Sequence, residues 1–444
     1  MNRSVSARFS VALICAGILA TMLAAPVSAG TTARWVDDDS SPGDGPNACD
    51  SAAFSSIQAA IDASNAWDHV NVCPGTYTEQ LTLDVRGILV QSVPYRSAHL
   101  VAPVLAAEVD GITSLVRMTA WAARLLAFRI DIPAGPAPAS TFIPTCSPID
   151  VAVLALAERN RVRWNVIDAT GDATYSGICG YAYGIVFTDE IGPPTFGVPY
   201  PIETGRATHN VVRDFKWGGI LVEGARKVRI DHNKVRFLHA DDPGCSYSVS
   251  PCLPSAAPTE VNSAFGAAFG IGVEDGALAD IQANNVKSNF TLPADTIIVG
   301  PMYLTDGIHL IGADGDSRIR GNKVVGTQQA ISVGPGFAAP PPPVLPTSTA
   351  GVEIANNTVT GNETGIQLTS DANDVHDNES HDNAGGIIVY DGEDNQIHDN
   401  DARDNTEIDC YDATTDGGTS GTANWWTDNL GATSSPGGLC GSPN

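Results

Sequence analysis

The stretch "VHDNESHDNAGGIIVYDGEDNQIHDN", Val375 to Asn400, states one short pattern twice. Val375 is followed three positions later by Asn378, and Ile397 is followed three positions later by Asn400. The apolar run from Gly386 to Val389 lies between these two copies. Short alternating segments bounded by Gly, Asn and Asp are typical of strands and turns, not of a 3.6-residue helical period. The stretch therefore predicts a repeated unit of short strands.

The same unit recurs along most of the chain. A short strand pattern, usually beginning Gly-Ile, is centred on Ile185, Ile220, Ile271, Ile308, Ile331, Ile366, Ile387 and Ile408. The last three isoleucines are 21 residues apart. A unit of this size cannot bury its apolar side chains alone, so it must stack on its neighbours. We expect an all-β, single-domain, right-handed parallel β-helix, with successive coils about 4.8 Å apart.

A second pattern, apolar-x-x-Asn, follows the isoleucine strands. It ends at Asn165, Asn233, Asn284, Asn322, Asn357, Asn378 and Asn400. Buried backbone groups at a bend need hydrogen-bond partners, and Asn side chains can supply them. We interpret these residues as a side-chain ladder at one bend of the coil, with a structural role.

Four further segments carry a resemblance to a known family. They are "WVDDD" from Trp35, "FSSIQAAIDAS" from Phe54, "DHVNVCPGTYTEQ" from Asp68 and "NWWTDNLGATSSPGGLC" from Asn424. Together they resemble the two ends of secreted right-handed parallel β-helix proteins of the pectin-lyase-like superfamily. The resemblance implies a capping helix over residues 54–64 and a first strand over residues 70–77. It implies no single activity, because this fold hosts lyases, hydrolases, epimerases, tailspikes and non-catalytic surface proteins.

The chain is expected to have four regions. Residues 1–29 read as a signal peptide, with Arg3 and Arg8 before an apolar run and small residues at the cleavage site. Residues 30–80 would form the N-terminal cap and first strand, residues 81–412 the β-helix, and residues 413–444 the C-terminal cap. Loop insertions rich in Pro and Gly are expected near 188–206, 239–269, 289–305 and 334–349.

Eight cysteines remain after the signal segment, an even number for an oxidising compartment. Nearest-neighbour pairing would join Cys49 to Cys73, Cys146 to Cys179, Cys245 to Cys252, and Cys410 to Cys440. The sequence leaves the other connectivities open. Disulfides at the first and last pair would fasten the two caps.

The net charge of the chain limits the classes of molecule that it is expected to bind. The chain has 50 acidic and 24 basic residues, a net charge of −26. A field of this sign repels nucleic acids and anionic membranes. No later apolar run approaches the length of a membrane span, so we expect a secreted protein without membrane insertion. An extracellular polysaccharide is the expected partner, and the oligomeric state stays open.

The insertions would wall a groove over the sheet that contains the isoleucine strands. Period-two alternation directs the residue after each isoleucine outward, and then the residue two further on. Glu223 and Glu274 therefore fall on neighbouring coils, and His309 lies on the next coil. Two carboxyl groups about 5 Å apart are what a retaining glycosidase requires. We predict Glu223 and Glu274 as catalytic residues with His309 assisting, against a solvated acidic face as the alternative.

Four residues are predicted to bind substrate along the same groove. Trp217 would stack on sugar rings at the rim, Asp275 lies at the groove edge, and Tyr390 and Tyr411 would extend an aromatic platform. The competing interpretation is that Trp217 packs under a loop and that the two tyrosines stabilise the sheet.

No metal site is assigned. Ca²⁺ is the one cofactor considered, because it could bridge the acidic pair. His376 and His398 lie one coil apart, each beside an Asp, but no further convergent ligands are evident for a transition metal.

The function predicted from the sequence is that of a secreted carbohydrate-active β-helix protein. It would bind an extracellular polysaccharide and, as an enzyme, cleave it as a hydrolase or a lyase. An acidic groove favours hydrolysis of a neutral or weakly charged glycan over β-elimination. The alternative is a non-catalytic surface, adhesion or structural protein that uses the stiff coil as a rod.

Overall fold

The structure is a computed structural model. It describes residues 31–39, 48–103, 112–132, 151–168, 183–188, 203–213, 215, 218–237, 268–288, 305–334 and 349–441. The predicted signal peptide and the interiors of the predicted insertions lie outside these residues. The chain divides into two compact units, Met1–Thr31 and Thr32–Asn444. The second unit holds all of the secondary structure that follows.

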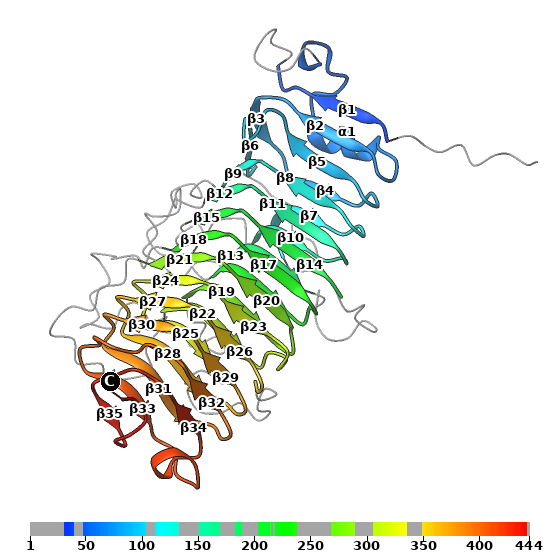
Figure 1. Cartoon of the computed structure of the whole chain (residues 1–444). Coiled ribbons are helices and arrows are strands. Elements are labelled where there is room, and N and C mark those ends of the chain that lie inside the picture. Colours follow the sequence, from blue (N-terminus) through cyan, green and yellow to red (C-terminus); the bar gives the residue numbers. More distant parts are fainter. Residues whose placement is uncertain are drawn as a thin grey trace, which may run out of the picture. The chain divides into compact units, whose positions relative to one another are not determined.

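Short parallel strands of this unit follow one another around a coil and form three sheets (Figure 1). Sheet A runs in the order β1 (Ala33–Val36), β2 (His69–Val72), β5 (Leu89–Ser92), β8 (Arg124–Leu126), β11 (Asn160–Arg163), β14 (Gly205–Thr208), β17 (Val228–Asp231), β20 (Ala279–Gln282), β23 (Arg318–Arg320), β26 (Glu353–Ala355), β29 (Asp374–His376), β32 (Gln396–His398) and β34 (Trp425–Thr427).

Sheet B contains β3 (Gly75–Thr78), β6 (Ala98–Val101), β9 (Arg129–Asp131), β12 (Val166–Asp168), β15 (Val211–Arg213), β18 (Lys234–Phe237), β21 (Asn285–Ser288), β24 (Lys323–Val325), β27 (Thr358–Thr360) and β30 (Glu379–His381). Sheet C contains β4 (Leu81–Leu83), β7 (Ser114–Met118), β10 (Val151–Ala155), β13 (Tyr183–Thr188), β16 (Gly218–Glu223), β19 (Ala268–Glu274), β22 (Thr305–Ile311), β25 (Gln329–Val333), β28 (Thr364–Thr369), β31 (Gly385–Asp391), β33 (Ile408–Asp412) and β35 (Ser434–Ser435).

Within each sheet a strand pairs with the strands one coil before and after it, except at the two ends, and the described pairings are all parallel. Parallel connections of this kind are right-handed with few exceptions. The predicted fold class, a single-domain right-handed parallel β-helix, is confirmed.

Aliphatic side chains fill the interior of the coil. The predicted isoleucine column is present in sheet C, where Ile185, Ile220, Ile271, Ile308, Ile331, Ile366 and Ile387 are in register and fully buried. The last step differs from the prediction. Cys410, not Ile408, lies opposite Ile387, and Ile408 lies opposite Gly385. The register already shifts between Leu368 and Thr369, and a shift of two residues leaves the same face inward.

The predicted asparagine ladder is also present and is longer than expected. It connects Asn165, Asn210, Asn233, Asn284, Asn322, Asn357, Asn378, Asn400 and Asn429 at the bend between sheets A and B. Each Oδ1 within the run accepts from the backbone N–H of the preceding member, and each Nδ2 donates to a carbonyl of an earlier coil, as Asn233 does to Ala207 at 3.0 Å. These bonds satisfy backbone groups that the bend removes from the sheet.

The N-terminal end has the expected short helix. α1 spans Ile57–Asp62, shorter than the predicted 54–64, and Ser56 caps it by accepting from the N–H of Ala59 at 3.3 Å. Glu79 accepts from the N–H groups of Ile57 and Gln58 at 2.9 and 3.0 Å. A carboxylate is favourable at a helix N-terminus. The expected first strand over 70–77 is in fact two strands, β2 and β3, and β1 precedes both.

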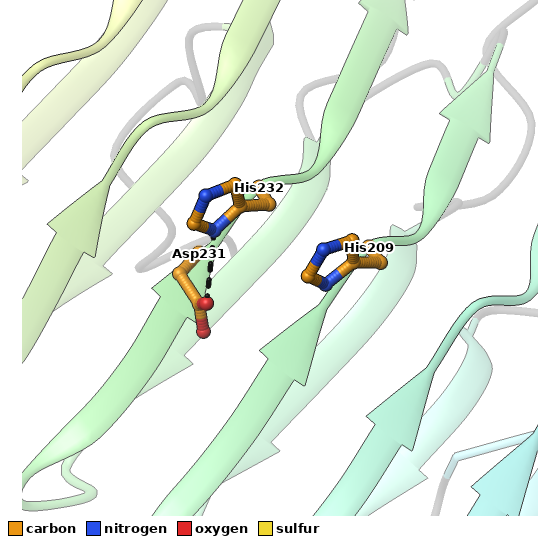
Figure 2. A group of neighbouring side chains, drawn as sticks. All are labelled: His209, Asp231 and His232. Carbon is orange, nitrogen blue, oxygen red and sulfur yellow. Dashed lines mark hydrogen bonds and ion pairs between the residues drawn. The ribbon is translucent and has the colours of Figure 1, made fainter.

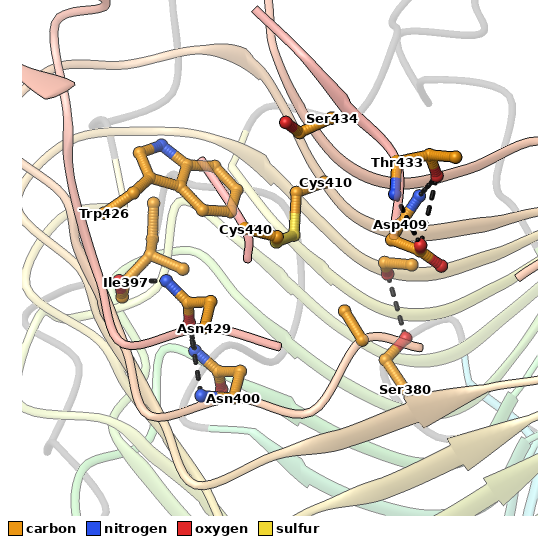
Figure 3. Close-up of a disulfide and its surroundings, with 12 residues drawn as sticks. Ser380, Ile397, Asn400, Asp409, Cys410, Trp426, Asn429, Thr433, Ser434 and Cys440 are labelled. Carbon is orange, nitrogen blue, oxygen red and sulfur yellow. Dashed lines mark hydrogen bonds between the residues drawn. A yellow bond between two sulfur atoms is a disulfide. The ribbon is translucent and has the colours of Figure 1, made fainter. Parts of the chain in front are cut away.

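Two of the four nearest-neighbour disulfides lie within the described residues and are present. Cys49 pairs with Cys73 and Cys410 pairs with Cys440, with Cα atoms 5.9 and 6.2 Å apart. Figure 3 shows the second pair beside Trp426 and Asp409 at the C-terminal end of the coil. Cys146, Cys179, Cys245 and Cys252 lie outside the described residues, so their pairing stays a prediction.

Candidate functional site

The register of sheet C brings the predicted carboxyl pair together. Glu223 at the end of β16 lies opposite Glu274 at the end of β19, and both side chains are half-buried. Neighbouring strands are about 4.8 Å apart, at which distance two carboxylates repel each other unless a proton or a cation intervenes. The pairing predicted from the spacing is present, and the catalytic role assigned to it stays a prediction.

His309 on β22 links this pair to a third carboxyl group. Its Nε2 atom lies 2.8 Å from Oε1 of Glu274, and its Nδ1 atom lies 3.3 Å from Oδ2 of Asp306. Both His309 and Asp306 are buried, with 2% and 3% of their surface exposed. The imidazole is therefore held at both nitrogens by carboxylates.

The charge of His309 follows from these contacts. Burial alone would lower the pKa of its imidazole, but the hydrogen bonds and charges of Asp306 and Glu274 outweigh burial and raise the pKa to about 9. His309 is therefore an imidazolium at neutral pH, and both of its nitrogens donate. A group in this state cannot accept a proton as a base. It holds Glu274 in place through the hydrogen bond from Nε2 to Oε1.

Phe269 and Gly272 shape the space around His309. The ring of Phe269 lies 4.3 Å from the imidazole, centroid to centroid, and Gly272 lies directly opposite His309 in the register. A Cβ atom at Gly272 would come within 2.8 Å of Nε2 of His309 and within 2.7 Å of the Phe269 ring. Glycine is needed at this position because it leaves room for both rings.

Asp306 was not predicted. Residues three apart on a straight strand point to opposite faces, so Asp306 and His309 would be expected to face away from each other. Gly307 lies between them, and a Cβ atom there would come within 2.5 Å of the carbonyl oxygen of Ala330. The Asp three residues before the His in "TDGIHL" was the one available signal.

The outer face of sheet C differs from the expected open groove. The first outward column was expected to face the groove, but its members are buried: Val186, Leu221, Gly272, His309, Ser332, Gln367, Ile388 and Asp409. Val186, Leu221 and Phe269 belong to an apolar cluster that also contains Val151 and Leu154. Packing within this apolar cluster shields the first outward column from solvent. The second column is more accessible, as the half-buried Glu223 and Glu274 show.

Asp275 directly follows Glu274 and is exposed, with a left-handed φ of 52°. Partial desolvation and, after it, the neighbouring charge of Glu274 raise the pKa of Asp275. A carboxyl group that holds its proton more tightly than usual thus lies directly beside Glu274. A carboxyl group with a raised pKa can serve as a general acid.

The tyrosine platform is only partly as expected. Tyr411 lies opposite Ile388 and not opposite Tyr390, because of the shifted register at the end of sheet C. The two rings still approach to 6.0 Å between centroids at an angle of 60°, and Tyr390 is 43% exposed. Trp217 lies outside the described residues, so its place at the rim stays a prediction.

Two groups of three metal-type side chains come together in the part of the chain that the structure describes, and neither contains Glu223 or Glu274. One is Asp37, Asp38 and Asp39; Asp38 accepts from the N–H of Thr76 at 2.8 Å. Three carboxylates are a donor set that suits Ca²⁺, but exposed acidic groups are common without it.

The second group is His209, Asp231 and His232 at the ends of β14 and β17 (Figure 2). The carboxylate of Asp231 is already occupied. It accepts from Nε and Nη2 of Arg206 at 3.0 and 3.1 Å, and Arg229 lies 3.3 Å away. Guanidinium groups beside the carboxylate repel a metal cation. This group therefore does not fit a metal well.

Comparison with known proteins gives one family match. A family described as "Periplasmic copper-binding protein (NosD)" matches residues 288–419, well under half of the chain. No curated protein matches the chain.

Several solved structures are similar over most of the chain. The Dettilon tailspike protein gp208 is 14% identical over 85% of this chain, with a TM-score of 0.49, and this chain spans 63% of it. The A-module of Azotobacter vinelandii mannuronan C-5 epimerase AlgE6 is 13% identical, with 85% of this chain and 83% of that one covered and a TM-score of 0.46. Pectate lyase Pel9A is 11% identical, with coverage of 82% and 80% and a TM-score of 0.44.

The described helices include none long and apolar enough to cross a bilayer.

Proposed function

We propose that this chain is an exported carbohydrate-active protein that binds and hydrolyses a neutral or weakly charged extracellular polysaccharide at Glu223, Glu274 and His309. The observation that carries the proposal is the buried His309, held between Asp306 and Glu274 beside a second glutamate. Buried titratable groups with perturbed pKa values gather at functional sites.

The geometry supports a division of roles. The imidazolium of His309 fixes Glu274, which suits a carboxylate that attacks the anomeric carbon or stabilises positive charge there. Glu223, one strand away, is the proton donor in this proposal. Asp275 is the second candidate for the donor, because its pKa is raised. A strand spacing of about 4.8 Å is near the separation of about 5 Å that retaining glycosidases use. His309 acts as a positioning residue.

The negative charge of the site favours a neutral or weakly charged glycan as the substrate. Asp306 and Glu274 hold the imidazolium of His309. Glu223 lies opposite Glu274 in the register, and Asp275 directly follows Glu274 in the chain. A polyuronate would meet repulsion here, and β-elimination needs a cation to neutralise the substrate carboxylate. Hydrolysis of a neutral glycan meets neither difficulty. Trp217, Tyr390 and Tyr411 remain proposed sugar contacts.

Copper is not part of the proposal. The family match covers residues 288–419. In the described part of that segment, the histidine pair that most resembles a metal site is His376 and His398, whose ring centroids are 5.1 Å apart. Nδ1 of each is bonded to its neighbouring aspartate, and Nε2 of His398 is bonded to Asp374 at 3.1 Å. Among the described residues, these histidines do not belong to a group of three His, Cys, Asp or Glu side chains whose ligand atoms all lie within 4.8 Å of one another.

The test is a panel of neutral and acidic glycans incubated with the protein, with and without Ca²⁺, while reducing ends and unsaturated products are followed separately. Glu274→Gln should abolish the appearance of reducing ends and leave glycan binding intact. Glu353→Gln is the matched control, because Glu353 is a half-buried glutamate on sheet A. Binding without cleavage of any glycan by the unaltered protein would favour the adhesion or structural role instead.

A further inference from the structure

The outer face of sheet A carries a column of four arginines. Arg124, Arg161, Arg206 and Arg229 lie opposite one another on the consecutive strands β8, β11, β14 and β17, which Figure 1 shows side by side. Arg163 lies two residues after Arg161, on the same face. All five side chains are at least partly exposed. We call these five residues the arginine surface.

Little negative charge compensates the arginine surface. Asp231 accepts from Arg206 and lies 3.3 Å from Arg229. Among the residues that the structure describes, no carboxylate pairs with Arg124, Arg161 or Arg163. Stacked guanidinium groups repel one another: burial, and after it the charge of Arg161, lower the pKa of Arg124. Repulsion within this cluster opposes folding, although the chain as a whole has a net charge of −26.

Aromatic rings lie beside the arginine surface at the C-terminal ends of its strands. Arg163 lies over the ring of Trp164 at 4.3 Å, and the ring of His209 follows Trp164 at 6.2 Å. His232 stacks on His209 at 4.9 Å with the rings nearly parallel (Figure 2). Burial, and then the charge of His232, lower the pKa of His209, so this ring is favoured in its neutral form.

The N-terminal ends of the same strands have a similar combination of aromatic rings and guanidinium groups. Trp121 lies under Arg86 at 4.8 Å and under Arg159 at 4.9 Å. Trp67 meets Trp121 edge to face at 5.7 Å and is 42% exposed. Flat aromatic faces beside cationic groups suit a ligand that has both apolar ring faces and anionic substituents.

We propose that the arginine surface binds a linear acidic polysaccharide, with carboxylate or sulfate groups of the polymer seated on Arg124, Arg161 and Arg163, because Asp231 already pairs with Arg206 and Arg229. Guanidinium groups bind such anions with two parallel hydrogen bonds. The rungs repeat at about 4.8 Å, so an extended polymer meets a cation at regular intervals. Acidic residues elsewhere are screened beyond about 10 Å at 0.1 M salt.

Beyond these four strands the charges in the same column alternate in sign, with Asp280, Arg318 and Glu353 on the next three strands. The cationic stretch is therefore narrow and short, which suits one flexible chain better than a nucleic-acid duplex. It lies on a different sheet from the candidate hydrolytic site and does not depend on the proposed function.

The experiment measures binding of polygalacturonate, dextran sulfate, neutral dextran and single-stranded DNA to the full chain from about 0.1 M salt upward, where the remaining acidic residues are screened. The variant is Arg161→Gln with Arg163→Gln. The matched control is Arg318→Gln with Arg320→Gln, which removes the same charge from the same two columns of sheet A. Arg318 and Arg320 are both paired with Glu353. Circular dichroism confirms that each variant is folded.

We expect at least one acidic polysaccharide to bind and neutral dextran not to bind. R161Q/R163Q should weaken binding about tenfold and reduce its salt dependence, and R318Q/R320Q should change it less than about twofold. The two anionic polymers separate carboxylate from sulfate recognition. The proposal is overturned if neither binds, if both double variants lose affinity equally, or if DNA binds more tightly than either polysaccharide and loses affinity in R161Q/R163Q.

Discussion

Nε2 of His309 lies 2.8 Å from Oε1 of Glu274, although 35 residues separate the two in the chain. The contact exists because Gly272 and His309 are opposite each other on neighbouring strands, with Glu274 two residues beyond Gly272. On the other side of the ring, Asp306 holds Nδ1. One buried imidazole thus joins two coils and two carboxylates.

The charge of His309 makes stability depend on pH in a defined direction. Its pKa is raised from 6.5 to about 9, so its stabilising effect is complete below pH 6.5 and is lost as the pH rises through 9. The shift corresponds to about 3 kcal/mol. Unfolding of the unaltered protein and of His309→Gln, followed from about pH 6 to about pH 10, should show a steeper loss of stability in the former. His232→Gln, at an exposed imidazole, should follow the unaltered protein. Equal slopes for all three proteins would contradict the assigned charge.

Gly272 is predicted to be indispensable for the site. In Gly272→Ala the new methyl group meets both the Phe269 ring and His309, so we expect a destabilisation of about 1 to 3 kcal/mol and a loss of any hydrolytic activity. Gly417→Ala is the control, because a Cβ atom there meets nothing within 4 Å. Chemical denaturation measures both. An unchanged midpoint for Gly272→Ala would show that the packing around His309 is looser than described.

Much of this arrangement could be predicted from the sequence, because the strand period and the coil repeat are local patterns. The isoleucine spacing alone placed Glu223 beside Glu274 and His309 on the next strand. Asp306 could not be found in this way, since its contact with His309 requires a departure from strand alternation at Gly307. The burial of the outward column depends on distant apolar partners such as Phe269 and Leu154.

Three other features could not be predicted from the sequence, because the repeat there departs from its regular pattern or spacing. Asn210 was missed because Ala207 stands where the pattern requires a larger aliphatic residue. Tyr411 was misplaced by two residues because the register shift in sheet C leaves no clear sequence signal. The arginine column has unequal intervals between Arg124, Arg161 and Arg206, so it becomes visible only after the coils are aligned.

The asparagine ladder should carry a large share of local stability. The side chain of Asn233 accepts from the N–H and Nδ2 of Asn210 and donates to Ala207 and Asn284, each at 3.0 Å. Asn233→Ala leaves these buried groups without partners, at a cost of about 2 to 4 kcal/mol. Asn285→Ala, at the exposed asparagine that directly follows the ladder residue Asn284, should cost less than about 1 kcal/mol. Comparable losses in urea denaturation would contradict a structural ladder.

The stereochemistry of the product tests the central claim most directly. With Glu223 and Glu274 on adjacent strands, hydrolysis should proceed with retention, so NMR of the first product from a cleaved glycan should show the anomeric configuration of the substrate. Glu274→Gln should release no product. An inverted anomer, an unsaturated sugar end, or full activity in Glu274→Gln would contradict the role given to the carboxyl pair.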